Sequence, residues 1–185
     1  MQKKRCAWVK NNDATYVVYH DEEWGVPLFN ERGLFELFSL ETQAAGLSWL
    51  TVLKKRESYR SAFANFDIAT VAGFTCREVD AIMQMNIIKN RAKIEAIIHN
   101  AKLFLHVQKE YGSLVKFFWG FVGGKPIVNS VEDYKIAPCS SPISDAITKE
   151  LKKRGFKFIG TITIYAFMQA CGMVNDHEHN CCVHS

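Results

Sequence analysis

The chain has 185 residues, a length that suits one domain, or two small lobes sharing a core. Hydrophobic residues make up 48% and charged residues 23%, the usual balance of a globular protein. No run of eighteen apolar residues occurs, which argues against a membrane span. The basic start of the chain leads into polar residues, unlike a secretory signal. We therefore expect a cytoplasmic protein, with residues 1–185 forming one domain.

Cysteine and charge patterns narrow the function classes. Six cysteines in a cytoplasmic protein indicate reduced or metal-bound thiols. Scattered cysteines are usually buried, and we expect this of Cys76, Cys139 and Cys171. The net charge is +4, and clustered basic residues suit phosphate contacts, although solvated helix faces explain any one cluster as well. The clusters are Lys54-Lys55-Arg56; Lys89, Arg91 and Lys93; and Lys149, Lys152, Lys153, Arg154 and Lys157.

Apolar residues recur at helical spacing through almost the whole chain. Capping residues and glycines set the expected helix ends. The expected helices run from Asn30 toward Gly46, from Ser48 to about Phe63, briefly from Asp67, from the Thr75–Glu78 capping box, over 91–111, from Ser113 to Gly123, over 144–154 and over 160–171. Residues 125–142 contain three prolines and are expected to be irregular. Strand patterns are too sparse for a sheet, so the predicted fold class is all-α.

A short apolar connection, Asn86-Ile-Ile-Lys-Asn-Arg91, separates two of these helices. Backbone amides of a tight hairpin, next to a helix N-terminus, favour an anion such as a phosphate. An ordinary helix–helix turn explains the same residues equally well. In a phosphate-binding hairpin, Asn86 is the residue best able to adopt a left-handed conformation.

Potential metal ligands are concentrated at the two ends of the sequence. A His-x-x-x-Cys pair such as His177 and Cys181 can chelate one ion, and a closed set of two cysteines and two histidines favours structural zinc. The tail holds five candidates, and two more lie near the start of the chain. They are His177, His179, Cys181, Cys182, His184, Cys6 and His20.

Glu41 stands in a sparsely charged stretch that ends at Trp49. A solvated helix position for Glu41 and a core position for Trp49 are the simplest readings of each residue. Aromatic walls with a carboxylate also fit a pocket for a flipped nucleobase, because the rings stack on the base and the carboxylate accepts its amine. Further aromatic residues lie between Cys6 and Trp24.

Six segments together resemble DNA-3-methyladenine glycosylase I, the Tag family of alkylation-repair enzymes. The resemblance extends from about Cys6 to Cys182. The segments are Cys6-Ala-Trp8, Tyr19-His-Asp-Glu-Glu-Trp-Gly25, Leu40-Glu-Thr-Gln-Ala-Ala-Gly-Leu-Ser-Trp49, Lys54-Lys-Arg-Glu57, Leu151-Lys-Lys-Arg-Gly-Phe-Lys-Phe158, and Met168-Gln-Ala-Cys-Gly172 with Val174-Asn-Asp-His177.

The resemblance implies a helix-hairpin-helix DNA glycosylase fold, with one structural Zn²⁺ clamping the termini together. The implied zinc ligands are Cys6, His20, His177 and Cys181. The implied base pocket contains Glu41 as the catalytic residue, with Tyr19, Trp49, Trp8, Tyr16 and Trp24. The implied DNA-binding residues are Gly46 and Leu47, beside the gap left by the flipped base, and Ile88, Lys89, Asn90 and Arg91 in the hairpin. Family members have glycine at the positions of Asn86 and Ala92.

The implied reaction is hydrolysis of the N-glycosidic bond of 3-methyladenine in double-stranded alkylated DNA, by a monomer. Methylation makes the base cationic, so it leaves as a neutral molecule and needs no strong general acid. No lysine occupies a plausible nucleophile position, so the expected products are free 3-methyladenine and an abasic site, without lyase activity. Two other readings stay open: a zinc-stapled binding module without activity, and a nucleobase deaminase, whose Pro-Cys-x-x-Cys string is missing here.

Overall fold

The computed structural model describes residues 4–10 and 12–183, and most of them are helical. The α-helices are α1 (Ala14–Glu22), α2 (Glu31–Ala44), α3 (Trp49–Leu53), α4 (Arg56–Ala62), α5 (Ile68–Ala72), α6 (Cys76–Ile82), α7 (Arg91–Tyr111), α8 (Leu114–Gly120), α9 (Pro142–Lys153) and α10 (Thr161–Ala170). Two 3-10 turns, η1 (Ala64–Phe66) and η2 (Tyr134–Ile136), and two strands, β1 (Ile127–Val128) and β2 (Val174–Asn175), complete the secondary structure.

Side-chain caps and left-handed glycines place most helix ends where the sequence predicts them. The Asn30 side chain accepts a hydrogen bond from the amide of Gly33 at the start of α2. Thr75 and Glu78 form the predicted capping box of α6. The longest helix, α7, has the predicted bounds because Asn90 caps its start and Gly112, with φ of 82°, follows its end.

Some helical predictions were wrong in detail, and one helix was missed. The helix expected from Ser48 to Phe63 is divided into α3 and α4, because the Lys55 amide bonds the carbonyl of Val52 and closes a tight turn. The α9 helix begins at Pro142 and not at Ser144, since Ser141 caps it and proline suits the first helical position. Helix α1 was not predicted at all.

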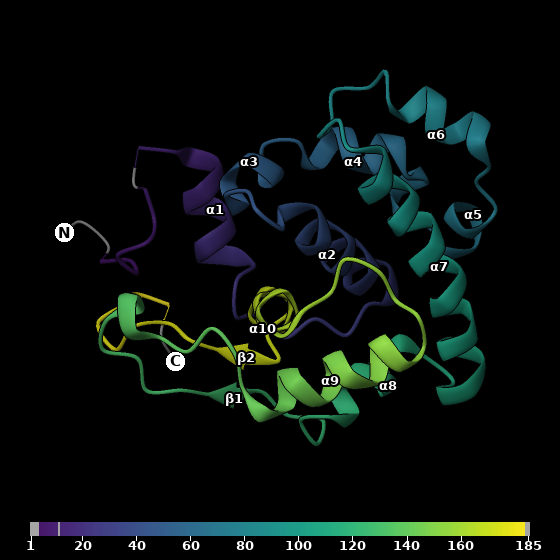
Figure 1. Ribbon diagram of the computed structural model, residues 1–185. Helices are drawn as coiled ribbons and strands as arrows, with labels where there is room; N and C mark the ends of the chain where they lie inside the picture. The colour runs from purple at the N-terminus through teal and green to yellow at the C-terminus, as the bar shows by residue number, and fades with distance from the viewer. Residues whose placement is uncertain (1–3, 11, 184–185) are drawn as a thin grey trace.

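A small parallel sheet also escaped the sequence prediction. Ile127 pairs with Val174 and Val128 with Asn175, so each strand contributes only two residues. Such short runs carry too little alternation to be recognised. The sheet joins the irregular segment after α8 to the C-terminal segment, as Figure 1 shows along the lower edge of the molecule.

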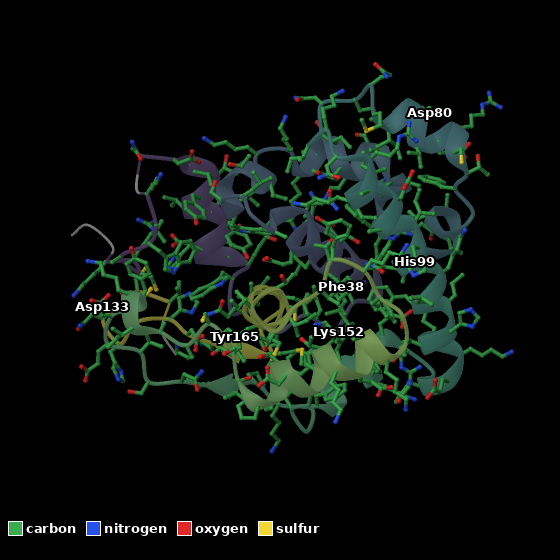
Figure 2. All side chains as sticks on the ribbon, in the orientation of Figure 1. Phe38, Asp80, His99, Asp133, Lys152 and Tyr165 are labelled. Atoms are coloured by element: carbon green, nitrogen blue, oxygen red, sulfur yellow. The ribbon has the colours of Figure 1, made fainter. Side chains whose placement is uncertain are left out.

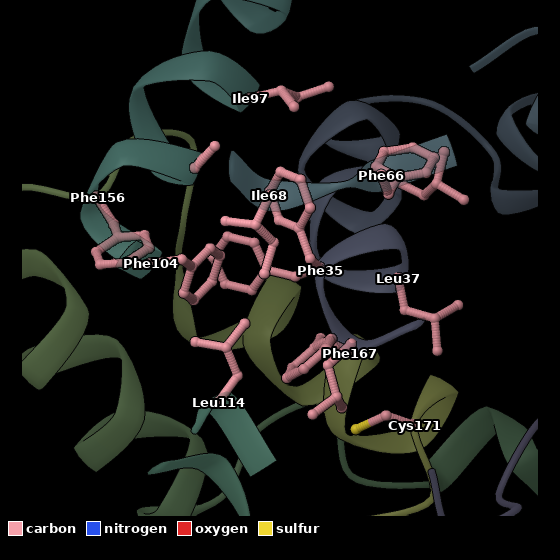
Figure 3. Packing of buried hydrophobic residues seen from close by; sticks show 14 of the residues in the cluster. Phe35, Leu37, Phe66, Ile68, Ile97, Phe104, Leu114, Phe156, Phe167 and Cys171 are labelled. Atoms are coloured by element: carbon pink, nitrogen blue, oxygen red, sulfur yellow. The ribbon is translucent and has the colours of Figure 1, made fainter. Parts of the chain in front are cut away.

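The core is built around α2, whose residues 34–43 are all buried. Phe38 on this helix packs its ring edge-on against the rings of Phe104, Phe156 and Phe167. Figure 3 shows aromatic residues of this core, among them Phe35 of α2, Phe104 of α7 and Phe167 of α10. Helix α10, seen end-on near the centre of Figure 1, is the buried helix predicted from its apolar sequence. Within residues 4–10 and 12–183, no helix has the length and apolar character to cross a bilayer.

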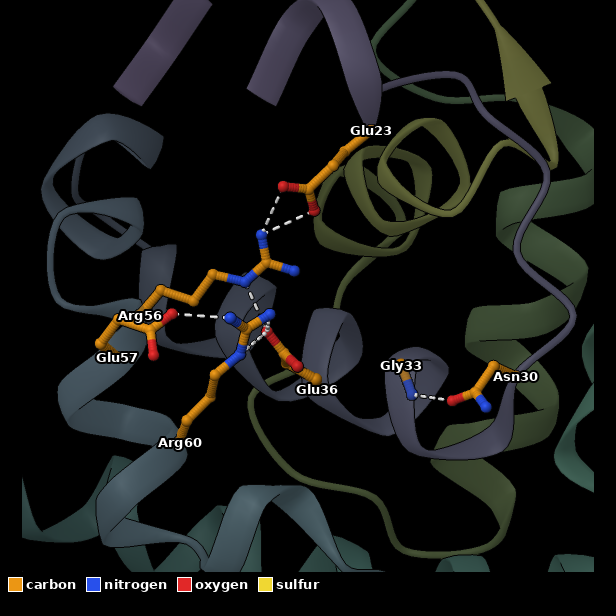
Figure 4. A network of polar contacts seen from close by, with 7 residues as sticks. All are labelled: Glu23, Asn30, Gly33, Glu36, Arg56, Glu57 and Arg60. Atoms are coloured by element: carbon orange, nitrogen blue, oxygen red, sulfur yellow. Dashed lines mark hydrogen bonds and ion pairs between the residues drawn. The ribbon is translucent and has the colours of Figure 1, made fainter. Parts of the chain in front are cut away.

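An ion-pair network joins α1, α2 and α4. Arg56 donates to both carboxylate oxygens of Glu23, at 2.8 and 2.6 Å, and to Glu36 on α2. Arg60 reaches the same Glu36 and also Glu57, as Figure 4 shows. Arg56 therefore forms its ion pairs within the protein, although the sequence placed it in a basic cluster suited to phosphate.

Two of the three cysteines expected to be buried are exposed. Cys171 lies in the core, as predicted, whereas Cys76 begins α6 on the surface and Cys139 lies in the proline-containing segment. Residue type alone does not distinguish these exposed thiols from the buried one.

Candidate functional site

One cavity of about 320 Å³ is lined by all six residues predicted to form the base pocket. This volume lies at the small end of ligand-binding sites. Helix α1 supplies Tyr16 and Tyr19, α2 supplies Glu41, and Trp49 begins α3. The network of Figure 4 joins α1, α2 and α4, so it connects the two helices that carry Tyr16, Tyr19 and Glu41.

Glu41 is buried in the wall of this cavity and is not the solvated residue that its type suggests. Its exposed fraction is 8%, and no described residue donates a hydrogen bond to its carboxyl group. Burial alone raises the pKa of Glu41 to about 8. A carboxyl group in this state is poised to gain from a cationic ligand, which would favour its charged form.

Tyr19 and Trp49 form the aromatic side of the cavity next to Glu41. Their ring centroids are 5.4 Å apart, and Tyr19 is almost fully buried. Burial, with a contribution from the charge of Glu41, raises the pKa of Tyr19 well above its usual value. The indole Nε1 of Trp49 is buried without a hydrogen-bond partner in the described part of the chain. This donor and the Glu41 acceptor are polar groups that a ligand could satisfy.

A further part of the cavity wall was not predicted from the sequence. Asp176 lines the same cavity and accepts hydrogen bonds from Asn129 at 2.6 Å, Tyr165 at 2.9 Å and Gln169 at 2.6 Å. Burial, then the neighbouring Asp176 charge, raises the pKa of Tyr165. Tyr165 is labelled on α10 in Figure 2. Asp176 and Gln169 both stood in segments that carried the family resemblance, but only the fold shows that they face the pocket.

The four predicted zinc ligands come together on the far side of the aromatic residues. Cys6, His20, His177 and Cys181 are all buried, and their ligand atoms lie within 4.8 Å of one another. Donors around a tetrahedral ion with bonds of about 2.0–2.3 Å stand roughly 3.5 Å apart, so a small contraction would close the site. His179 and Cys182 are exposed and stand outside this group, while His184 lies outside the described residues.

Neighbouring groups orient these four side chains. His20 directs Nδ1 to the Asp21 carboxylate at 2.8 Å, and its Nε2 lies 3.4 Å from the sulfur of Cys181. The Nδ1 atom of His177 lies 2.7 Å from the amide oxygen of Asn175. A ring nitrogen held in this way is the usual arrangement behind a metal-bound histidine. Burial raises the pKa of the Cys6 thiol to about 12, so a thiolate there requires a compensating cation.

Two tryptophans connect this cluster to the cavity. Trp8 packs 5.2 Å from the ring of His20, and Trp24 packs 4.6 Å from His177, while both line the cavity. Gly25 makes the close approach of this segment possible, because a β-carbon there would stand 2.9 Å from His177. The geometry supports the view that the cluster braces the pocket from outside.

The turn after α2 has the properties of a surface element. Gly46 has a φ of 77°, which glycine adopts without strain, and Leu47 is 45% exposed. An exposed leucine at the tip of a turn is suited to fill an apolar gap in a partner. Its predicted role against DNA stays a prediction.

The predicted hairpin over 86–91 is largely engaged with its own protein. Lys89 donates to the carbonyl of Met83, Arg91 pairs with Asp80, and Asn90 caps α7. The amide of Ile88 bonds the hydroxyl of Tyr59. Asn86 does not adopt the left-handed conformation expected of it. Ile88, Lys89, Asn90 and Arg91 thus form a defined helix–helix connection, and their contact with DNA remains a prediction.

A second hairpin, over 155–160, joins the packed helices α9 and α10. It begins with Gly155 at φ of 89° and ends with Gly160, the residue before α10. Phe158 between them has a φ of 55°, an uncommon conformation for an aromatic residue, and is 39% exposed. Three lysines that precede or lie within it, from the third basic cluster, are exposed: Lys152, Lys153 and Lys157.

Known proteins match this chain along almost its full length. The methyladenine glycosylase family model matches residues 8–184. A DNA-3-methyladenine glycosylase of Haemophilus influenzae is 51% identical, with 96% of each chain covered, and DNA-3-methyladenine glycosylase 1 of Escherichia coli is 49% identical, with 97% of this chain and 96% of the relative covered.

Solved structures agree with these sequence matches. A crystal structure of 3-methyladenine DNA glycosylase I (TAG) superposes with a TM-score of 0.94 at 49% identity, covering 98% of this chain and all of that one. A Staphylococcus aureus TAG structure that addresses 3-methyladenine recognition has a TM-score of 0.94 at 39% identity, covering 98% and 96%. The all-α fold is thereby confirmed, and the chain belongs to the methyladenine glycosylase family.

Proposed function

We propose that this protein removes 3-methyladenine from alkylated DNA by hydrolysing the N-glycosidic bond, as the first step of base-excision repair. The observation that carries the proposal is the Glu41 carboxyl group, buried beside Tyr19 and Trp49 without a donor among the described residues. A cationic purine would stack on the rings and supply both the positive charge and the amine that this carboxyl group lacks.

The chemistry follows from the charge of the lesion. A base methylated at N3 is cationic in DNA and becomes neutral when its bond to the sugar breaks, so it is already a good leaving group. The protein therefore has to extrude the nucleotide, hold the base against Glu41 and admit water to the sugar. Glu41 acts through recognition and electrostatic stabilisation, not through a strong acid. Since the pocket has no lysine among its lining residues, the product is an intact strand with an abasic site.

The direct test is release of free 3-methyladenine from methylated duplex DNA incubated with the protein. We expect the base in solution and strand breaks only after alkaline treatment, which cleaves abasic sites. Binding of alkylated DNA without base release would favour the binding-module reading. Strand cleavage without alkali would contradict the monofunctional mechanism. A deaminated base that stays in the DNA strand, with no base released, would favour the deaminase reading.

We also propose that two surface elements contact DNA. Leu47 would fill the space left by the extruded base, since it is exposed in the turn that follows α2, the helix that carries Glu41. The hairpin over 155–160 has glycines, exposed lysines and the start of α10, features that favour a phosphate. The hairpin over 86–91 is a weaker candidate, because this chain has Asn86 and Ala92 where family members carry glycine, and its side chains already bond the protein itself.

Zinc is the metal that best fits the buried cluster of two thiols and two imidazoles, and we propose one structural ion per chain. With Cys6, His20, His177 and Cys181 as ligands, no position would remain for water, so the ion would stabilise the fold and supply no reacting group. Cys181→Ser should lower the zinc content measured on the purified protein, whereas Cys182→Ser should not. Equal zinc in wild type and Cys181→Ser would contradict this ligand set.

We propose that the active species is a monomer, because the six residues predicted to form the base pocket all meet around one cavity within a single chain. Size-exclusion chromatography with light scattering at several concentrations tests it, and a stable dimer would contradict it.

A further inference from the structure

Helix α7 carries two buried polar residues that hold the backbone of other segments. Lys93 and Asn100 are 7% and 1% exposed. They are seven residues apart, about two helical turns, so they lie on the same side of the helix. Each side chain bonds main-chain groups of a turn that reaches the surface.

Lys93 holds the C-terminal end of α2. Its ammonium group donates to the carbonyls of Gln43 at 2.9 Å and Ala45 at 2.7 Å, and the Gln43 side chain donates back to the Lys93 carbonyl at 3.1 Å. No described carboxylate pairs with Lys93. Its positive charge instead interacts with the carbonyl groups at the C-terminal end of α2. The next residues are Gly46 and the exposed Leu47.

Asn100 holds the hairpin over 155–160. Its amide nitrogen donates to the carbonyl of Lys157 at 3.1 Å, and its amide oxygen accepts from the Lys157 amide at 2.9 Å. His99 lies beside it, with Nε2 3.0 Å from the carbonyl of Gly155. Figure 2 shows His99 on α7 next to the connection that leads from Lys152 on α9 to α10. This grip fixes the residue before Phe158, which has the left-handed conformation.

We infer that α7 is a strut that sets the distance between the Gly46–Leu47 turn and the 155–160 hairpin, and that Lys93 and Asn100 are positioning residues for extrusion of the damaged nucleotide. The inference rests on the proposed function. To extrude one nucleotide, Leu47 and the phosphate-binding hairpin must contact the same DNA strand at a fixed separation. A displacement of about 1 Å can reduce a rate roughly a hundredfold. No residue of α7 is among those that line the base pocket, so the pocket can stay intact when this spacing relaxes.

The experiment compares Lys93→Met and Asn100→Leu with Lys102→Met, a control at an exposed lysine of the same helix. Three quantities are measured: affinity for a duplex with a tetrahydrofuran abasic analogue, single-turnover release of 3-methyladenine, and affinity for free 3-methyladenine from tryptophan fluorescence. We expect DNA affinity and release to fall at least about tenfold in both test variants. Free-base affinity should stay within about twofold of wild type, and the control should be unchanged.

Two results would overturn the inference. One is release and DNA affinity equal to the control in folded variants. The other is a parallel loss of free-base affinity, which would assign both residues to general stability. If a test variant does not fold, Lys93→Gln and Asn100→Asp keep the side-chain size closer and are judged by the same criteria. If the wild-type protein released no 3-methyladenine, the proposed function itself would be refuted. The wild-type assay comes first, so the two failures can be told apart.

Discussion

Two carboxyl groups line the same cavity but differ in their hydrogen bonding. Asp176 receives three hydrogen bonds, from Asn129, Tyr165 and Gln169, whereas Glu41 receives none from any described residue. A buried carboxylate whose acceptors are filled is part of the framework, and one left without donors is costly until a ligand arrives. The difference separates a residue that builds the pocket from one that binds within it.

The largest expected effect follows from removing the charge of Glu41. We predict that Glu41→Gln lowers release of 3-methyladenine by about a hundredfold or more, because the amide cannot compensate a cationic base. Thermal unfolding should show no loss of stability, since no native hydrogen bond to this group is broken. Glu95→Gln, on the exposed side of α7, is the matched control. Unchanged release in Glu41→Gln would remove this residue from the mechanism.

The pH dependence of base release tests the role of the Glu41 charge separately. The pKa of Glu41 is raised to about 8, so the carboxylate is present above that pH and is lost as the pH falls through it. We predict that kcat/KM on methylated DNA rises with pH up to about 8, by up to roughly tenfold per unit. The remaining activity of Glu41→Gln should lack this rise. A wild-type profile that is flat between pH 6 and 8 would contradict the role given to the Glu41 charge.

Asp176 should affect stability more than chemistry. In Asp176→Asn an amide replaces one acceptor, so part of the hydrogen bonding from Asn129, Tyr165 and Gln169 is lost. We expect the free energy of unfolding to fall by about 1–3 kcal/mol. Release of 3-methyladenine should fall by about tenfold, through a displaced wall. Denaturant titration measures the free energy of unfolding and single-turnover kinetics measures base release, with Asp145→Asn on α9 as the control. If Asp176→Asn lost as much release as Glu41→Gln, the two carboxyl groups would not differ in role.

The smallest effect is expected from Tyr165→Phe. It removes one of the three donors to Asp176 and leaves the ring in place, so the free energy of unfolding should fall by about 0.5–1.5 kcal/mol. Release of 3-methyladenine should stay within about threefold of wild type. A larger kinetic effect would mean that the Tyr165 hydroxyl contacts the substrate directly.

Local sequence signals account for much of the fold and for one side of the site. The bounds of α7 follow from Asn90 and Gly112, each of which acts on its immediate neighbours. The break between α3 and α4 has no glycine or proline to mark it. Helix α1 was missed because its apolar residues do not form one stripe: Tyr19 faces the cavity and His20 the cysteine cluster.

Long-range contacts account for what the sequence could not supply. Asp176 becomes a pocket residue because α10 and the segment after β1 bring Tyr165, Gln169 and Asn129 against it. Arg56 and Lys93 seemed equally suited to phosphate, yet their partners inside the protein come from other helices. The four-residue cluster was predicted through family resemblance, and spacing alone left three further ligands open.

The cluster of Cys6, His20, His177 and Cys181 also imposes an order on folding. His20 and Cys181 are 161 residues apart in the chain. During synthesis Cys6 and His20 leave the ribosome long before His177 and Cys181. Trp8 can therefore pack on His20 early, whereas Trp24 gains its contact with His177 only after the last segment has been made. A nascent chain interrupted before His177 could therefore hold a formed core around α2 while its base pocket still lacked support on one side.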